Sequence, residues 1–341
     1  MNFEHEYPSF GQEHITMYQI LATTEEKEEC ARQFRVSHIH NKKPDDVVLS
    51  VSFFAKCPDP GLSPIEIPGD LTRLHPSIRR GEVTWDEAFI SRFEAGVKQL
   101  RERGVDWSIR AYVAADMEDY LHDRLMDLDV EMRVMETSSI YHNPGACWRF
   151  LAADDAEFFF TRDAEDINPT YVEEPCIRRF IDATKKHQDP RMFRMIWNWD
   201  YDDVSTVYRP VSGNGVGGRI MGAVNVRAAL EAYHWCGMRE QNDRTPPRSA
   251  FLPRWHMHPV RGPRELFGAA WPKYGGDEQF AGQFLYWAAC RGGWLDTVVG
   301  CNNPGVHVMM ASDLVEVLKH NPRAFVSWAD DPHWNLNPNT P

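Results

Sequence analysis

The chain has 341 residues, of which 43% are hydrophobic and 26% are charged. This composition allows a sizeable core, and it excludes a disordered chain, a collagen and a disulfide-stabilised miniprotein. The 50 acidic residues outnumber the 37 basic ones, for a formal net charge of −13. A protein with this charge binds polyanions only where it carries a local basic patch.

Hydrophobic patterning predicts strands and helices that alternate after residue 44. Expected strands are 47–54, 107–114, 130–135, 157–161 and 192–197. Expected helices are 25–35, 86–103, 116–125, 171–186, 222–235 and 277–290. This alternation is typical of a Rossmann-like α/β sheet. The sequence contains neither a G-x-G-x-x-G after the first strand nor a G-x-x-x-x-G-K-[ST], which disfavours NAD(P) enzymes and P-loop NTPases.

The cysteines and the apolar runs bear on the compartment. The cysteine count is 7, and no C-x-x-C pair occurs, as is typical of reduced thiols. No apolar run approaches the roughly 20 residues of a membrane helix. Residues 1–14 lack the apolar region of a signal peptide. We therefore expect a cytoplasmic protein with no membrane span.

The acidic residues around the strand 157–161 are the first candidates for chemistry. In open α/β sheets, ligands bind outside the carboxyl ends of the strands. Carboxylates placed there can hold a divalent cation, which neutralises a diphosphate. Asp163 and Glu165 are two residues apart, so in an extended chain their side chains share a face. The alternative is a solvated acidic turn that precedes the next helix.

Four short motifs follow one another along the chain. They are Trp148–Phe150 (WRF), Arg162–Glu165 (RDAE), Arg209 with Ser212–Arg219 (SGNGVGGR), and Asp277–Phe280 (DEQF). In this order they resemble the GT-A-fold nucleotide-sugar glycosyltransferases, above all a bacterial and viral group with a W-R-F … R-D-x-D core and a later D-E-x-F motif. The resemblance covers roughly residues 46–300. It implies a GT-A-like, Rossmann-type mixed sheet flanked by helices, in a single elaborated domain.

The resemblance also implies site residues. Asp163 and Glu165 would hold Mn²⁺ or Mg²⁺, with His307 as the candidate third ligand, and the donor would be a UDP-sugar. Asp277 or Glu278 would act as the base of an inverting enzyme. The alternatives are that Asp277 only caps its helix, that it contacts a sugar hydroxyl, or that the enzyme is retaining and needs no such base. The residues expected to line the donor site are Phe53, Trp148, Arg149, Arg162, Asp163, Glu165, Gly213 and Gly215.

The domain organisation that we expect has four parts. They are an N-terminal accessory arm (1–44), a nucleotide-sugar-binding α/β half (45–235), a basic aromatic loop (236–276) and an acceptor-side C-terminal part (277–341). The loop interleaves arginines with aromatic residues, which suits a glycan or an anionic acceptor, including a modified nucleic acid. The alternative is a solvated basic excursion.

Two other functions stay open at this point. A metal-dependent nucleotidyltransferase would use the same acidic residues on the same type of sheet, and an inactive protein would bind a nucleotide sugar or an anionic ligand without turnover. His38 and His40 alternate along the chain, as do His256 and His258. We interpret both pairs as surface or hydrogen-bonded histidines rather than zinc ligands, because neither has a third ligand nearby in the sequence.

Overall fold

The computed structural model describes residues 12–54, 86–137, 145–168, 173–186, 189–197, 216–242, 277, 280–286, 288, 295–302 and 305–310. The helical elements are α1 (Gln12–Leu21), α2 (Thr24–Gln33), η3 (Asp86–Ile90), α4 (Ser91–Glu102), η4 (Ala115–Met117), α5 (Glu118–Asp127), α6 (Gly145–Trp148), η5 (Arg149–Asp154), η6 (Ala164–Asp166), α7 (Glu173–Thr184), α9 (Val226–Asn242) and η10 (Ala281–Tyr286). The strands are β1 (Val36–His40), β2 (Val47–Phe53), β3 (Ser108–Val113), β4 (Glu131–Met135), β5 (Phe158–Thr161), β6 (Arg191–Trp197), β7 (Val216–Arg219), β8 (Leu295–Asn302) and β9 (Gly305–Met310).

Within these ranges, nine strands form one sheet in the order β1-β4-β3-β2-β5-β7-β6-β8-β9. The neighbours β4, β3, β2 and β5 are parallel, whereas β7 is antiparallel to both β5 and β6. β6 and β8 are again parallel, and β1 and β9 pair antiparallel at the two edges. The expected α/β class with a mixed sheet is therefore confirmed.

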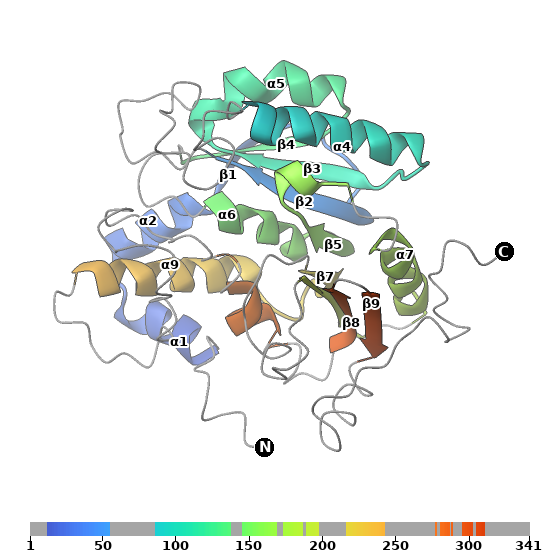
Figure 1. The fold of residues 1–341 in the computed structure, drawn as a ribbon. Coiled ribbons are helices and arrows are strands. Elements are labelled where there is room, and N and C mark those ends of the chain that lie inside the picture. Colours follow the sequence, from blue (N-terminus) through green and yellow to red (C-terminus); the bar gives the residue numbers. More distant parts are fainter. Residues whose placement is uncertain are drawn as a thin grey trace.

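Helices cover both faces of the sheet. Figure 1 shows α4 and α5 over one face of β2, β3 and β4, and α6 and α9 on the other side, with α1 and α2 packed against α9. α4 follows from its sequence, because Phe93, Val97 and Leu100 recur at helical spacing and are buried. The chain leaves this helix at Gly104, whose φ of 73° suits a glycine C-cap.

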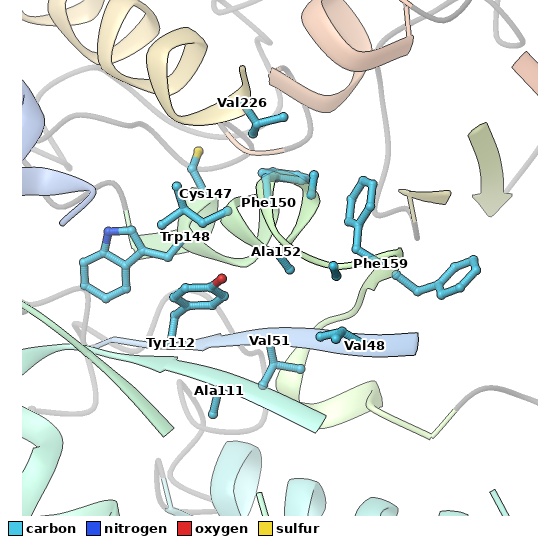
Figure 2. Packing of buried hydrophobic residues seen from close by; sticks show 14 of the residues in the cluster. Val48, Val51, Ala111, Tyr112, Cys147, Trp148, Phe150, Ala152, Phe159 and Val226 are labelled. Atoms are coloured by element: carbon cyan, nitrogen blue, oxygen red, sulfur yellow. The ribbon is translucent and has the colours of Figure 1, made fainter. Parts of the chain in front are cut away.

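β2 separates two packed layers because its side chains alternate between the two faces. Phe53 points toward α4, where its ring meets Phe93 edge-on with centroids 5.0 Å apart. On the opposite face, the segment formed by α6 and η5 packs on β2 and β3. Figure 2 shows Trp148 and Phe150 of this segment between the sheet and α9, with Val48 and Tyr112 on the sheet side. Trp148 is fully buried, and its indole Nε1 donates to the carbonyl of Gln33 at 2.8 Å.

A buried charge cluster closes the amino ends of the parallel strands. The fully buried Arg110 donates from Nε to Glu131 at 2.7 Å and from Nη1 to Asp155 at 2.6 Å, and it also contacts Asp45. Arg133 donates to Glu131 at 2.6 Å and also contacts Asp155. Because every buried guanidinium here has carboxylate partners, the cluster is a structural feature.

Most of the expected elements are present within a few residues of the expected bounds. The sequence did not predict α1, α6, η5, η6, β7, β8 and β9, and the prediction for residues 38–40 was wrong. These residues, expected to end a helix, belong to β1, whose largely exposed side chains give no apolar alternation. α9 continues to Asn242, so the first residues of the expected basic loop are helical, and residues 243–276 lie outside the described part of the chain.

No helix in the described ranges has the length and the apolar character needed to cross a membrane.

Gly218 provides a test of the β5–β7–β6 packing. A Cβ on this residue would lie 2.2 Å from the carbonyl oxygen of Arg191, and its φ of 147° is unfavourable for any other residue. Gly218→Ala is therefore expected to lower the free energy of unfolding by about 3 kcal/mol or more. The matched control is Gly104→Ala, which has a positive φ but nothing within 4 Å of the new Cβ. Its expected cost is only about 1 kcal/mol. Urea unfolding of both variants measures the difference, and equal costs would contradict the packing.

Candidate active site

The candidate site lies where the order of the parallel strands reverses. The chain continues from β2 to β3 and β4 on one side of β2, whereas β5 lies on its other side. In open α/β sheets such a switch point leaves a crevice at the carboxyl ends of the two strands. β2 ends at Phe53 and β5 at Thr161, so the residues that follow Thr161 lie at these carboxyl ends of the strands, called here the carboxyl edge of the sheet.

Arg149, the first residue of η5, is fixed at this edge through its backbone. The Ser50 hydroxyl donates to the carbonyl of Arg149 at 2.7 Å, and the amide of Arg149 donates to the Ser52 hydroxyl at 3.0 Å. Ser50 and Ser52 can act together because residues two apart in a strand share a face. The sequence analysis assigned no role to these serines. Two polar residues at this spacing in a buried strand are the signal that could have identified them.

The Arg149 guanidinium joins two of the predicted site residues. Nη1 donates to the carbonyl of Arg162 at 2.8 Å and also contacts the Asp163 carboxylate. Nη2 donates to Oδ2 of Asp277 at 2.6 Å, across 128 positions of the sequence. Burial by itself lowers the pKa of Arg149, but the carboxylates of Asp163 and Asp277 outweigh it and raise this pKa above its usual range. The predicted metal ligand and the predicted base thus meet at one cation.

The two carboxylates differ in their contact with solvent. The side chains of Asp277 and Arg149 are only 13% and 8% exposed, whereas the Asp163 side chain is 49% exposed. The Arg149–Asp277 pair is therefore a buried ion pair, and Asp163 is open to a ligand from solvent. Asp277 itself has helical conformation. The alternative that it only caps a helix does not account for its contact with Arg149.

Glu165 lies in η6, two residues after Asp163. Burial and then the Asp163 carboxylate raise the pKa of Glu165 to about 7, while Arg149 acts in the opposite direction. Repulsion between two nearby carboxylates is what a divalent cation relieves, and hard cations prefer oxygen ligands. The donor set of Asp163 and Glu165 therefore fits Mn²⁺ or Mg²⁺. In the described ranges no further acidic, histidine or cysteine ligand completes a compact group with them, and substrate phosphates commonly fill such positions.

Other acidic residues near β5 in the sequence have other roles. Asp154 accepts from the amides of Val226 and Arg227, both at 2.8 Å, and so caps α9. Asp155 belongs to the Arg110 cluster at the amino ends of the parallel strands. The exposed Asp166 accepts from Arg92 at 3.0 Å. Asp163 and Glu165 lie near Arg149, so the acidic residues around β5 are divided among separate sites.

Of the other predicted donor and metal residues, Arg162 meets Arg149 through its backbone carbonyl. The rings of Phe53 and Trp148 are buried in the core, Phe53 on the α4 side of β2. The buried Arg162 directs Nε to the carbonyl of Asp166 at 3.0 Å. His307 lies on β9, and three strands separate β9 from β5. Their roles stay predictions, as do those of Gly213, Gly215 and Glu278, which lie outside the described residues.

A comparison of the chain with protein-family models, with curated proteins and with solved structures finds no match. The geometry around Arg149 and the motifs that supply it are therefore the features that indicate a function.

Double-mutant cycles test the ion pairs of Arg149. Arg149→Met leaves the carboxylate of Asp277 buried without its partner, so we expect the free energy of unfolding to fall by about 3 kcal/mol. Adding Asp277→Asn should recover part of this loss. The coupling of Arg149 to Asp163 should be smaller, about 1 kcal/mol or less, because Asp163 is half exposed. Chemical unfolding measures both couplings, and a stronger coupling to Asp163 would contradict the arrangement.

The pH dependence of stability tests the environment of Glu165. The pKa of Glu165 is about 7 in the folded chain and 4.5 ordinarily. At a pH between these two values, the folded state therefore binds the proton more tightly than the unfolded state does. The contribution of Glu165 to the free energy of unfolding therefore falls as the pH rises from about 5 to 8. Glu165→Gln removes the effect, and its advantage over the wild type should grow across this range, on the order of 1 kcal/mol.

The measurement is urea unfolding at pH 5 and pH 8 in the presence of EDTA. The control is Asp166→Asn, which removes an exposed carboxylate from the same turn. Asp166 raises the pKa of Glu165 less than burial and Asp163 do, so this variant should differ from the wild type by a much smaller trend. A constant difference between Glu165→Gln and the wild type would show that Glu165 is not desolvated.

Proposed function

We propose that this chain is a glycosyltransferase of the GT-A type. It moves a sugar from a nucleotide-sugar donor, a UDP-sugar, to a glycan or an anionic acceptor, with the help of Mn²⁺ or Mg²⁺. One observation carries the proposal. Arg149 of the WRF motif contacts Asp163 of the RDAE motif and Asp277 of the DEQF motif at the strand-order reversal.

This convergence is independent of the resemblance itself. The resemblance depends on short motifs in a certain order along the chain, which by itself says nothing about their positions in space. The fold brings three of the motifs to one edge of the sheet, where α/β proteins bind nucleotides. The mixed sheet is also of the kind that the resemblance implies.

The transfer step assigns a role to each carboxylate. The acceptor oxygen forms a bond to the anomeric carbon of the sugar as the bond from that carbon to the diphosphate oxygen breaks. Asp163 and Glu165 would hold the divalent cation, which neutralises the charge that grows on the departing diphosphate. Arg149 keeps Asp163 and Asp277 in place.

Asp277 is positioned to accept the proton of the acceptor hydroxyl. Arg149 contacts its Oδ2, so Oδ1 is the atom that we expect to face the acceptor. A base is needed for an inverting transfer, since the hydroxyl loses its proton as it attacks. The burial of Asp277 beside Arg149 fixes its orientation, which is the requirement for such a base.

The direct test is release of nucleoside diphosphate from UDP-, GDP- and ADP-sugars by the purified chain. We expect slow hydrolysis of a UDP-sugar with Mn²⁺ or Mg²⁺ and none with EDTA. Asp163→Asn should lower the rate by about 100-fold or more. Asp166→Asn is the matched control in the same turn, and it should retain the rate within about twofold, because its carboxylate faces Arg92 instead.

The products distinguish the other functions. Release of pyrophosphate from a nucleoside triphosphate with a sugar phosphate would instead show a nucleotidyltransferase. Thermal stabilisation by UDP with Mn²⁺ but without turnover would show an inactive binding protein. If no nucleotide sugar is hydrolysed and no nucleotide stabilises the chain, the proposal is wrong.

A further inference from the structure

A second group of chemically active side chains lies between β1 and α5, away from Arg149. His38 and His40 alternate on β1, so they share a face of the strand. Glu118 and His122 are four residues apart on α5, so they share a face of that helix. His38 Nε2 lies 2.6 Å and His40 Nε2 2.8 Å from the same oxygen, Oε1 of Glu118.

We propose that His38, His40 and Glu118 form a binding site for a zinc-like divalent cation. The ligand atoms of these three side chains lie within 4.8 Å of one another. A tetrahedral zinc ion with bonds of about 2.0–2.1 Å requires ligand atoms about 3.3 Å apart. Movements of less than about 1 Å in exposed side chains therefore convert the observed arrangement into a coordination shell. Two imidazoles and one carboxylate are a donor set that zinc accepts, with the fourth position left open.

The surroundings of the three ligands support this site. The side chains of His38, His40 and Glu118 are 43%, 29% and 27% exposed, so an ion can reach them from solvent. The Ser37 hydroxyl lies 3.1 Å from Nδ1 of His38, which leaves Nε2 directed at the site. Metal-bound histidines commonly have such a partner on the second nitrogen.

His122 is a candidate for the fourth position. Its ring lies edge-on to that of His40, with centroids 4.8 Å apart, although it is outside the three-atom group as it stands. Its Nδ1 is 2.9 Å from the Asp123 carboxylate, which would orient the ring for binding through Nε2. Two candidate ligands thus lie on β1, two residues apart, and two lie on α5, four residues apart. Each spacing puts both side chains of a pair on one face of its element.

The site is separate from the candidate active site. β1 is an edge strand, and β4, β3 and β2 separate it from β5. Four strand spacings correspond to about 19 Å, too far for shared ligands. Figure 1 shows α5 above the β4 and β1 side of the sheet, so an ion here would tie the edge strand to the helix that covers it. The expected effect of the ion is therefore on stability.

The experiment uses the full chain without a histidine tag, stripped of metal by chelation. Titration with Zn²⁺ is followed by calorimetry and by the melting temperature. We expect one ion with a micromolar or lower dissociation constant and a rise in Tm. Mg²⁺ should not compete for this site, because it prefers oxygen ligands. Co²⁺ should give the visible absorption of a tetrahedral complex.

Variants assign the binding to these residues. His38→Ala with His40→Ala should remove Zn²⁺ binding, and Glu118→Gln should weaken it at least tenfold. The matched control is the double variant His256→Ala with His258→Ala, a histidine pair with the same spacing, which should bind as the wild type does. Asp163→Asn should also bind normally, which separates this result from the proposed catalytic metal.

Two results would overturn the proposal. One is a wild-type chain whose Tm does not respond to Zn²⁺. The other is unchanged binding after loss of both His38 and His40. Circular dichroism verifies that each variant is folded, and the variant His38→Gln with His40→Gln, which keeps polar side chains on β1, replaces the alanine pair if that pair does not fold.

Discussion

The buried guanidinium of Arg149 is the charge on which the candidate site depends. Burying a cation is costly unless carboxylates and hydrogen-bond acceptors surround it. Here the acceptors come from Arg162, Asp163 and Asp277, while Ser50 and Ser52 fix the backbone from β2. Four segments that are distant in sequence are therefore positioned by one residue. Loss of either carboxylate alters the balance of charge at Arg149.

The described part of the chain contains two clusters of buried arginine, and the difference between them is informative. At the amino ends of the strands, Arg110 and Arg133 share Glu131 and Asp155, and the guanidinium groups are enclosed. At the carboxyl ends, Arg149 has one buried and one half-exposed carboxylate. Both clusters have half-exposed carboxylates, since Asp45 and Asp155 in the first are 36% and 41% exposed. What distinguishes the second is Glu165, whose pKa is raised by burial and by the Asp163 carboxylate. A carboxyl group perturbed by both burial and a charged neighbour is typical of a ligand site.

The sequence predicted elements where burial is periodic. α4 is an example, because its apolar residues follow the helix spacing, and β2 could be predicted as a continuous apolar run buried on both faces. β1 was missed since its side chains are mostly exposed, and η5 because a buried segment of six residues has too few turns to show a period. At the site, Asp163 and Asp277 could be chosen from motifs. Their meeting at Arg149 could not, because a contact across 128 positions depends on the order of the strands.

The N-terminal segment contributes to the same framework. β1 pairs with β4, while α1 and α2 pack on α9. Tyr18 donates to Glu231 at 3.3 Å, and the indole of Trp235 donates to Glu26 at 3.1 Å. α9 is in turn capped by Asp154, the last residue of the η5 segment that begins with Arg149. The arm thus supports α9, and α9 holds the far end of η5. The position of the Arg149 guanidinium is therefore set from both sides, by the serines of β2 at one end of η5 and by the arm-supported helix at the other.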